Sequence, residues 1–301
     1  MLAGVTRAAL FAPLILLATI AHANEKTITH LTVAGRDVAL WKPAGETPPT
    51  GFPLIVFSHG FTGCSTQTVF LMEALAHAGY FVIAPNHRDA RSGTATQAGW
   101  YPGKMLANRP QAPFQNPEAW SDQTYRDRYN DMEAVLNEVL RAKTFAGVPI
   151  DANRVGIAGH SLGGYTVLGL AGGWSSWKDP RVKAVLALSP HCSPYLDHGN
   201  LHLGIPIMYQ GGTRDFGETP LVRRANGAFD KSSAPRYYVE LDGAGHFAWT
   251  DLNKSYQELI DTYSIAFFNR YLKNLDDPDP LAPLMRKPLS KGVSDVRVVL
   301  N

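Results

Sequence analysis

Apolar and polar residues alternate along the chain in a way that predicts strands separated by helices. Residues 52–60 (FPLIVFSHG) are almost continuously apolar and end at a glycine, which is typical of a strand buried on both faces. Residues 66–79 (TQTVFLMEALAHAG) instead repeat their apolar positions at helical spacing and end at a glycine, so they predict a helix. Residues 80–85 (YFVIAP) return to the pattern of a buried strand.

The same alternation continues to the end of the chain. Further strands are predicted at 154–159, 182–190, 205–212 and 236–243. Further helices are predicted at 121–145, with Ser121 as the N-cap, at 161–173 and at 254–272. Strands that alternate with helices indicate an α/β fold, in which a mostly parallel central sheet is covered by helices on both faces.

Three segments depart from this alternation. Residues 27–43 (TITHLTVAGRDVALWKP) alternate around an Ala-Gly turn and predict an antiparallel edge hairpin. Residues 86–120 are irregular, rich in Gly, Pro, Asn and Gln, and carry several aromatic residues, so we expect a long loop that lines a pocket. The Pro-rich tail after Leu275 is expected to lie over the surface.

The first residues of the chain resemble an export signal. Arg7 precedes an apolar stretch at 8–20, and the small residues of AHA at 21–23 follow it. This order predicts a secretory signal peptide, residues 1–23, that is cleaved after Ala23. The alternative is a membrane anchor, but the apolar stretch is shorter than the ~20 residues that a span needs. We therefore expect a secreted or periplasmic protein with one catalytic domain at 24–301 and no stable membrane insertion.

Composition narrows the candidate partners. The 301 residues are 45% hydrophobic and 18% charged, which is typical of a globular protein. The net charge is only +2 and no basic run is present, so no nucleic-acid partner is expected. No metal-ligand spacing and no nucleotide-binding glycine loop appear, so we expect no metal and no cofactor. Cys64 and Cys192 either form a disulfide or remain two buried thiols, and the oligomeric state stays open.

Ser161 is the candidate nucleophile. It lies in the sequence Gly159-His160-Ser161-Leu162-Gly163, between a predicted strand and a predicted helix. This is the G-x-S-x-G pattern of a sharp turn that projects a serine hydroxyl clear of a sheet. Turn filler is the plainer interpretation, but the strand before and the helix after favour the catalytic one.

A serine needs a base, and the base needs a group that orients it. His246 lies in the Gly-rich segment DGAGHF after the last predicted strand, where it can reach Ser161. Asp215 follows the strand at 205–212 and is the candidate acid, and Asp197, after the strand at 182–190, is the alternative.

Two backbone N–H groups are expected to stabilise the oxyanion of an acyl-transfer reaction. They belong to Leu162, which follows the nucleophile, and to Phe61, in the turn SHGFTG after the first buried strand. We expect the side chains of Phe61, Trp100 and Trp249 to contact substrate. His160 is a further candidate for substrate binding, with packing as its alternative. Arg88 and Asp89 are expected to form a structural ion pair.

The segments SHGFTGCSTQ, APNHRDARSGTA, GIAGHSLGG and GAGHF resemble the α/β-hydrolase superfamily, and the likeness covers nearly the whole mature chain. They are most similar to the branch that holds dienelactone-hydrolase-like esterases, platelet-activating-factor acetylhydrolases and bacterial, cutinase-like polyester hydrolases. The resemblance implies a triad of Ser161, Asp215 and His246, with Phe61 and Leu162 as oxyanion donors. The chain departs from dienelactone hydrolases, which use cysteine as nucleophile, and from polyester hydrolases, which usually carry tryptophan at the position of His160.

These observations predict a secreted serine carboxylesterase that acts on short-chain, aromatic or polymeric esters. A lipid acetylhydrolase or an exopeptidase is the alternative within the same fold. A non-catalytic binding protein on a hydrolase scaffold is the alternative outside enzymes, although such proteins typically lose a member of the triad and this chain has a candidate for each.

Overall fold

The computed structural model describes residues 28–91, 110–274 and 279–301, and its centre is one mixed sheet of ten strands. The strands lie in the order β1-β2-β4-β3-β6-β7-β8-β9-β10, and β5 pairs with β6 outside this path. They span Ile28–Val33 (β1), Arg36–Trp41 (β2), Phe52–Ser58 (β3), Phe81–Pro85 (β4), Thr144–Phe145 (β5), Val148–His160 (β6), Val182–Leu188 (β7), Ile207–Gly212 (β8), Arg236–Leu241 (β9) and Val293–Val299 (β10).

Neighbouring strands from β4 to β9 run parallel, and the pairs at the two edges run antiparallel. The longer helices are α1 (Val69–His77), α3 (Arg126–Leu140), α4 (Leu162–Leu168) and α8 (Gln257–Leu272). Short helices and turns complete the set: η1 (Pro117–Ala119), η2 (Gly169–Gly173), η3 (Ser175–Trp177), α5 (Ser193–Asp197), α6 (Thr219–Arg223), α7 (Ala228–Lys231), η4 (His246–Trp249) and α9 (Ala282–Met285).

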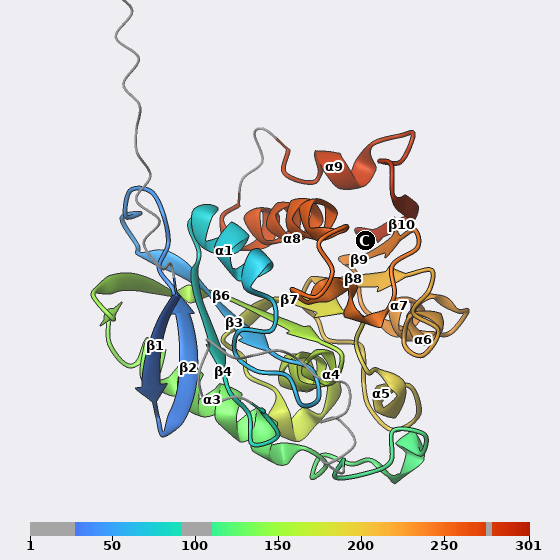
Figure 1. Cartoon of the computed structure of the whole chain (residues 1–301), viewed down its shortest axis with the longest axis horizontal. Helices are drawn as coiled ribbons and strands as arrows, with labels where there is room; N and C mark the ends of the chain where they lie inside the picture. Colours follow the sequence, from blue (N-terminus) through green and yellow to red (C-terminus); the bar gives the residue numbers. More distant parts are fainter. Residues whose placement is uncertain (1–27, 92–109, 275–278) are drawn as a thin grey trace, which may run out of the picture.

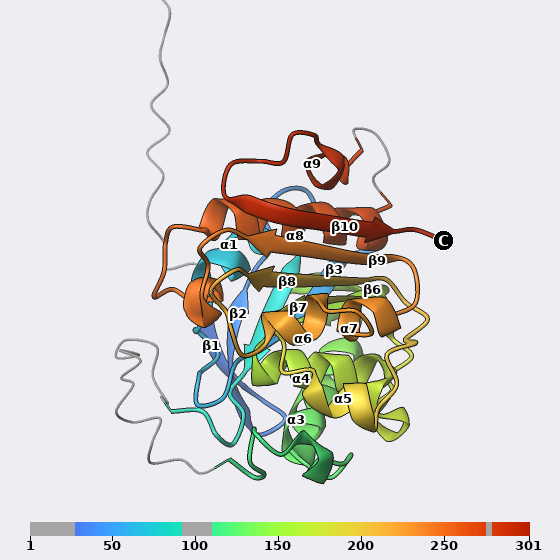
Figure 2. The ribbon, with the colours of Figure 1, turned by 90° about the vertical axis from the view of Figure 1, so that its right-hand side faces the viewer.

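Helices cover both faces of the sheet. Helices α1 and α8 lie on one face, and α3 and α4 lie on the other (Figures 1 and 2). Two apolar clusters correspond to these two layers, one that includes side chains of α1 and α8 and one that includes side chains of α3 and α4. Strand β3 is buried at all of its positions, as its continuous apolar sequence predicts. The arrangement is that of an α/β-hydrolase fold, so the predicted fold class and the N-terminal hairpin are confirmed.

Two predicted elements differ from those observed. Helix α3 begins at Arg126 instead of Ser121, because Tyr125 adopts φ +57° and its backbone N–H donates to Gln111 Oε1 (2.5 Å). This left-handed residue prevents the helix from starting earlier. The C-terminal tail was expected to cover the surface, but its last residues form β10, which pairs with β9 at the sheet edge.

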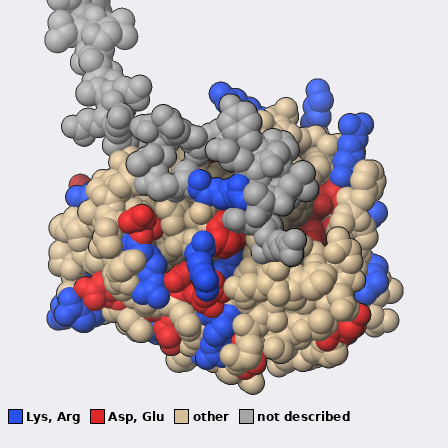
Figure 3. Space-filling view, turned by 60° about the horizontal axis from the view of Figure 1, so that its bottom comes forward, with Lys and Arg blue, Asp and Glu red and all other residues tan. Residues whose placement is uncertain are grey.

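Several sequence predictions fall on residues outside the described ranges. They include the signal peptide at 1–23 and the candidate pocket residue Trp100. Among the described residues, no helix has the length and apolar character needed to cross a membrane. Cys64 and Cys192 are both buried and form no disulfide, so they are two buried thiols. On the face shown in Figure 3, basic and acidic side chains are interspersed.

Candidate active site

The backbone at Ser161 is forced into an unfavourable conformation. Ser161 has φ +56° and ψ −117°, between the end of β6 and the start of α4. A conformation of this kind costs on the order of 1–3 kcal/mol in a residue other than glycine. Three backbone hydrogen bonds hold it: Ser161 N–H donates to Leu188 O (3.0 Å), and the N–H groups of His191 (2.9 Å) and Tyr165 (3.1 Å) donate to Ser161 O. The turn therefore projects the hydroxyl of Ser161 away from the sheet at the end of a central strand.

The two glycines of the motif are required by close approach of backbone. A Cβ atom at Gly159 would overlap the carbonyl of Gly163. A Cβ atom at Gly163 would overlap the carbonyl of Ser58, at the end of β3. Glycine at these positions therefore lets the Ser161 turn lie directly against the segment that follows β3.

Ser161, His246 and Asp215 come together across the ends of three strands. His246 Nε2 lies 2.9 Å from Ser161 Oγ. On the other side of the ring, His246 Nδ1 lies 3.2 Å from Asp215 Oδ1. The side chain of His246 is 28% exposed, whereas that of Asp215 is 2% exposed. Asp197, the alternative acid, is the exposed last residue of α5, so the carboxylate within reach of His246 is that of Asp215.

The surroundings of Asp215 keep its carboxyl group ionised. Burial acts to raise the pKa of Asp215, but the hydrogen bond and positive charge of His246 oppose it. Hydrogen bonds from Ser189 and Thr219 add to that opposition, and the net result is a pKa below the usual value. An ionised, buried carboxylate at this distance fixes the Nδ1–H tautomer of His246 and stabilises the imidazolium.

Ser189 contacts both Asp215 and His246, a role that was not predicted from the sequence. Its hydroxyl donates to Asp215 Oδ2 (2.5 Å), and its Oγ lies 2.8 Å from His246 Nδ1. Because the proton of the hydroxyl is directed to Asp215, Oγ is free to accept the Nδ1–H of His246. Ser189 is fully buried and has φ +43°, directly after β7. A positive φ cannot be read from the sequence Leu-Ser-Pro, so no local pattern pointed to this role.

The two candidate oxyanion donors lie on adjoining segments. Leu162 is the first residue of α4, where a backbone N–H has no partner within the helix. Within the described ranges, the N–H of Phe61 has no hydrogen-bond acceptor either. The turn that carries Phe61 lies beside the nucleophile, since a Cβ atom at Gly60 would lie 3.5 Å from Ser161 Cβ. The arrangement places two candidate donors next to Ser161.

His160 is placed differently from the expectation of substrate contact. It is 2% exposed, and its ring lies between Gln67 and the backbone of His246. Gln67 Nε2 donates to His160 Nδ1 (2.9 Å), so His160 Nε2–H donates to His246 O (2.8 Å). Burial, together with the charge of His246, lowers the pKa of His160 to about 3. His160 therefore holds the His246 segment in place, and its burial corrects the substrate-binding expectation.

Trp249 also needs correction. The side chain is fully buried, and its indole N–H donates to Gln210 Oε1 (3.1 Å), so it belongs to the core. Phe61 is only half-buried, and its ring packs edge-on against Phe114 of the irregular segment at 5.4 Å. Aromatic residues next to the triad are exposed to solvent: Phe216 at 81% and Phe247 at 37%. Phe216 and Phe247 directly follow Asp215 and His246 in sequence, and Phe61 lies on the turn beside Ser161.

Asp89 pairs with a residue that sequence reasoning did not consider. Arg88 is exposed, and Asp89 forms its ion pair with Arg128 of α3 (2.8 Å). Arg88 and Asp89 are the two central residues of a turn that is closed by Ala90 N–H donating to His87 O (2.8 Å), and their side chains have different surroundings. Across the residues that the structure describes, no group of three or more His, Cys, Asp or Glu side chains is arranged to hold a metal ion.

The chain matches the models of two protein families. Residues 105–279, more than half of the chain, match the model of a family described as PET hydrolase-like. Residues 16–111 match a second family model, platelet-activating factor acetylhydrolase, isoform II.

Among curated proteins, the chain is similar to cutinases of the genus Thermobifida. Cutinase 1 of Thermobifida cellulosilytica is 27% identical over 223 residues, which cover 73% of this chain and 68% of that protein. A cutinase of Thermobifida fusca (strain YX) is 27% identical over 223 residues, which cover 73% of this chain but 60% of that protein. Cutinase est2 of Thermobifida alba is 26% identical over 220 residues, which cover 72% of this chain and 59% of that protein. The match thus spans less than two thirds of the second and third cutinases.

Proposed function

The chain belongs to the PET hydrolase-like family, and from this premise we propose that it is a serine carboxylic-ester hydrolase. The observation that carries the proposal is the 2.9 Å contact between Ser161 Oγ and His246 Nε2 at a strained turn. Strain of this kind persists only where the surrounding structure imposes it, and it concentrates at functional sites. The similarity to cutinases supports an ester as the substrate.

The first half of the reaction acylates Ser161. His246 Nε2 accepts the hydroxyl proton as Ser161 Oγ attacks the ester carbonyl, which forms a tetrahedral intermediate with a negatively charged oxygen. The N–H groups of Phe61 and Leu162 donate to that oxygen. His246 then gives its proton to the leaving alkoxide, the C–O bond breaks, and the alcohol departs from an acyl-enzyme.

The second half regenerates the serine. Water loses a proton to His246 Nε2 and attacks the acyl carbonyl, and the same two N–H groups stabilise the second oxyanion. Collapse of this intermediate returns the proton from His246 to Ser161 Oγ and releases the carboxylic acid. Throughout, the Asp215 carboxylate and the Ser189 hydroxyl hold the Nδ1–H side of the ring, so that Nε2 faces the reacting atoms.

The acyl or aryl part of the ester is proposed to lie against the aromatic residues beside Ser161. Phe61 and Phe114 are half-buried and in contact, and the exposed Phe216 and Phe247 directly follow Asp215 and His246 in sequence. Exposed aromatic side chains next to a nucleophile suit an apolar or aromatic ester, because binding removes their apolar area from water.

Labelling at Ser161 tests the mechanism. A fluorophosphonate should add one covalent group to the wild-type protein, located at Ser161 by peptide mass spectrometry, and should not label Ser161→Ala. Hydrolysis of p-nitrophenyl esters of increasing chain length should accompany labelling, while a peptide anilide should remain intact. Labelling of Ser161→Ala to the same extent would contradict the assignment of the nucleophile. Cleavage of the anilide alone would favour an exopeptidase.

A lipid acetylhydrolase is the second candidate, because residues 16–111 match the platelet-activating factor acetylhydrolase model. It differs from the first proposal in the alcohol part of the ester. Release of acetate from an acetylated choline phospholipid, at a kcat/KM well above that for p-nitrophenyl acetate, would favour this alternative.

Export and domain organisation form part of the proposal. The order of residues 1–23 supports a cleaved signal peptide, and residues 24–301 are proposed to be one catalytic domain. N-terminal sequencing of protein recovered from outside the cytoplasm should begin at Asn24. Protein that retains Met1 in the membrane fraction would support an anchor instead.

A further inference from the structure

Side chains bind several polar backbone groups of the turn that carries Phe61. Gly60 N–H donates to Gln67 Oε1 (2.9 Å), and Thr62 N–H donates to Asp89 Oδ2 (2.9 Å). The carbonyls of His59 and Gly60 accept from Arg128 Nη1 (2.7 Å) and Nη2 (3.1 Å). Between these contacts, the N–H of Phe61 keeps no hydrogen-bond partner among the described residues.

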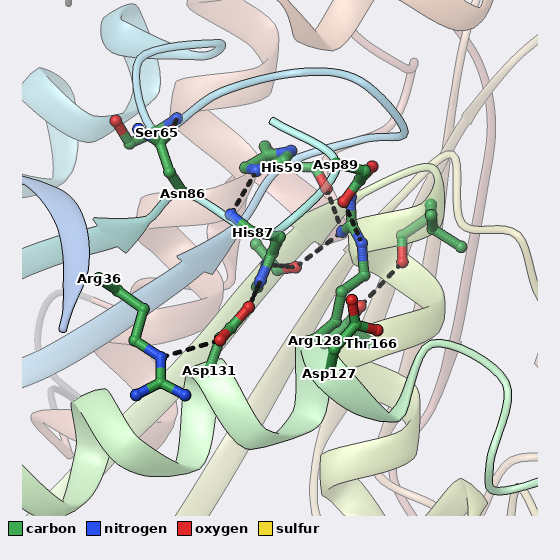
Figure 4. A network of polar contacts seen from close by, with 12 residues as sticks. Arg36, His59, Ser65, Asn86, His87, Asp89, Asp127, Arg128, Asp131 and Thr166 are labelled. Carbon is green, nitrogen blue, oxygen red and sulfur yellow. Dashed lines mark hydrogen bonds and ion pairs between the residues drawn. The ribbon is translucent and has the colours of Figure 1, made fainter. Parts of the chain in front are cut away.

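Arg128 and Asp89 make these contacts as one unit. Arg128 Nε and Nη2 donate to the two carboxylate oxygens of Asp89, at 3.1 and 2.8 Å. Figure 4 shows the Arg128 side chain pointing from α3 towards Asp89 and the segment of His59. Arg128 is fully buried. Burial acts to raise the pKa of Asp89, but the charge and hydrogen bonds of Arg128, together with the neighbouring histidines, outweigh it and keep that pKa well below the usual value.

A neighbouring histidine supports the same carbonyl. His87 N–H donates to His59 Nε2 (3.0 Å), so His59 carries its proton on Nδ1, which donates to Gly60 O (2.7 Å). The pKa of His59 is lowered first by burial and then by the charge of Arg128, which keeps the ring neutral. The Gly60 carbonyl therefore faces inward, towards Arg128 and His59.

The direction of the Gly60 carbonyl decides that of the Phe61 N–H. The peptide between them is trans and planar, so its C=O and N–H point in opposite directions. Arg128, His59 and the Gly63 N–H (3.0 Å) all donate to the Gly60 carbonyl and hold it inward. The N–H is therefore directed to the opposite side, and the turn lies beside Ser161. Rotation of this peptide would instead present a carbonyl oxygen, which repels a developing oxyanion.

We infer that Arg128, paired with Asp89, is a positioning residue that holds the Gly60–Phe61 peptide so that the Phe61 N–H serves as an oxyanion donor. The inference rests on the proposed function, since it assigns a role in the same reaction. Arg128 acts through the peptide and does not touch the substrate. Lysine cannot replace it, because an ammonium group cannot bind a carboxylate with two parallel bonds and two carbonyls at once.

The test compares Arg128→Lys with the wild type in three measurements. These are kcat and KM for a p-nitrophenyl ester, the Ki of an aryl trifluoromethyl ketone, and the midpoint of thermal unfolding. The ketone adds the Ser161 hydroxyl and forms an oxyanion in the same position as the intermediate, so its Ki depends on the donors. We expect kcat to fall roughly 10- to 100-fold, less than deletion of an oxyanion donor costs. We expect KM to change little and Ki to rise by a similar factor to the fall in kcat.

Arg154→Lys is the matched control. Arg154, in the middle of β6, pairs with Asp151 (2.7 Å) and donates to the carbonyl of Gly51 (3.0 Å), and none of these three residues contacts the triad in the described ranges. It should lower the unfolding midpoint without changing kcat or Ki. Asp89→Glu is the second variant at the site, because it keeps the charge opposite Arg128 but displaces the carboxylate by one methylene. It should reproduce the fall in kcat and the rise in Ki.

The outcomes separate the inference from the proposed function. A wild type that hydrolyses no ester and is not labelled at Ser161 would refute the proposed function. An active wild type whose Arg128→Lys variant folds and keeps its kcat and Ki would overturn the inference alone. If Arg128→Lys does not fold, Asp89→Glu decides in the same way. Failure of both variants to fold would assign the pair to stability and would also overturn the inference.

Discussion

Two series of Ser, His and Asp side chains in this molecule have nearly the same geometry. In the first, Ser161 Oγ lies 2.9 Å from His246 Nε2, and His246 Nδ1 lies 3.2 Å from Asp215. In the second, Ser58 Oγ lies 2.8 Å from His87 Nε2, and His87 Nδ1 lies 3.1 Å from Asp131. The distances alone do not distinguish them.

The surroundings of the two sets of side chains distinguish them. Ser58 and the side chain of His87 are fully buried, whereas the side chain of His246 is 28% exposed. Ser58 belongs to the regular strand β3, whereas Ser161 lies in a strained turn. Asp131 forms an ion pair with Arg36 (2.9 Å). Burial, followed by the charge of Arg128, lowers the pKa of His87 well below its usual value, which favours the neutral ring. Access and charge therefore separate a candidate active site from a structural network.

The largest difference is expected between the two serines. Ser161→Ala should lower ester hydrolysis by roughly 10⁶-fold, because it removes the nucleophile, while the protein stays folded. Ser58→Ala should keep its activity and lose about 1–3 kcal/mol in the free energy of unfolding, because His87 Nε2 loses a buried partner. Steady-state kinetics and urea denaturation measure both effects. Loss of hydrolysis in a folded Ser58→Ala would show that the buried series is catalytic and would end the comparison.

Substitution of the two aspartates should show the same contrast, with loss of activity at Asp215 and loss of stability at Asp131. Asp215→Asn should lower kcat by about 10⁴-fold, because an amide favours the wrong tautomer of His246. Asp131→Asn should mainly lower the unfolding midpoint, because Arg36 loses its ionic partner. The kcat of each purified variant and its thermal melt decide between these effects. A normal kcat for Asp215→Asn, with a large loss in Asp197→Asn, would move the acid to Asp197.

A smaller effect is expected at Ser189, which has no equivalent in the buried series. Ser189→Ala removes the shorter of the two contacts to His246 Nδ1 and should cost about 1–3 kcal/mol. If that loss falls on the transition state, kcat drops roughly 5- to 150-fold. Thr219→Val is the control, because the Thr219 hydroxyl donates to Asp215 Oδ2 (3.0 Å) and, within the described ranges, makes no hydrogen bond to His246. Equal kcat values for the two variants would remove Ser189 from the positioning of the base.

The smallest effect is a change in the pH dependence of stability. Burial is the main cause that lowers the pKa values of His59, His87 and His160 below the ordinary value of 6.5. Below pH 6.5 the unfolded chain binds protons that the folded protein does not, so stability is full above that pH and falls as pH decreases. Each neutral histidine contributes about 1.4 kcal/mol per pH unit. Charged groups that face His87 oppose one another: Arg128 lowers its pKa and Asp89 raises it.

His87→Gln should therefore reduce the slope of unfolding free energy against pH by about 1.4 kcal/mol per unit between pH 6 and 4. Urea denaturation at a series of pH values measures the slope. A slope equal to that of the wild type would mean that folded His87 takes up a proton, which is incompatible with its assigned place in the buried network.

Much of the fold followed from local sequence. Continuous apolar runs predicted β3 and β4, and helical spacing predicted α1 and α8, because burial of apolar side chains decides these elements. The start of α3 and strand β10 were not predicted. The start of α3 depends on the hydrogen bond from Tyr125 to Gln111, and β10 depends on pairing with β9. Both interactions join residues that are separated along the chain, so no local pattern predicts them.

The sequence by itself determined the fold class and pointed to Ser161, His246 and Asp215 as candidates, because a glycine-flanked serine after a buried strand is a local pattern. Only the tertiary structure decided which polar side chains surround them. Ser189 lies far along the chain from Asp215 and His246, Gln67 from His160, and Arg128 from Asp89 and the turn of Gly60. These hydrogen bonds exist only once the strand ends meet. Burial also decided against His160 and Trp249 as substrate contacts. Side-chain exposure depends on the packing of the whole fold, and no short sequence pattern specifies it.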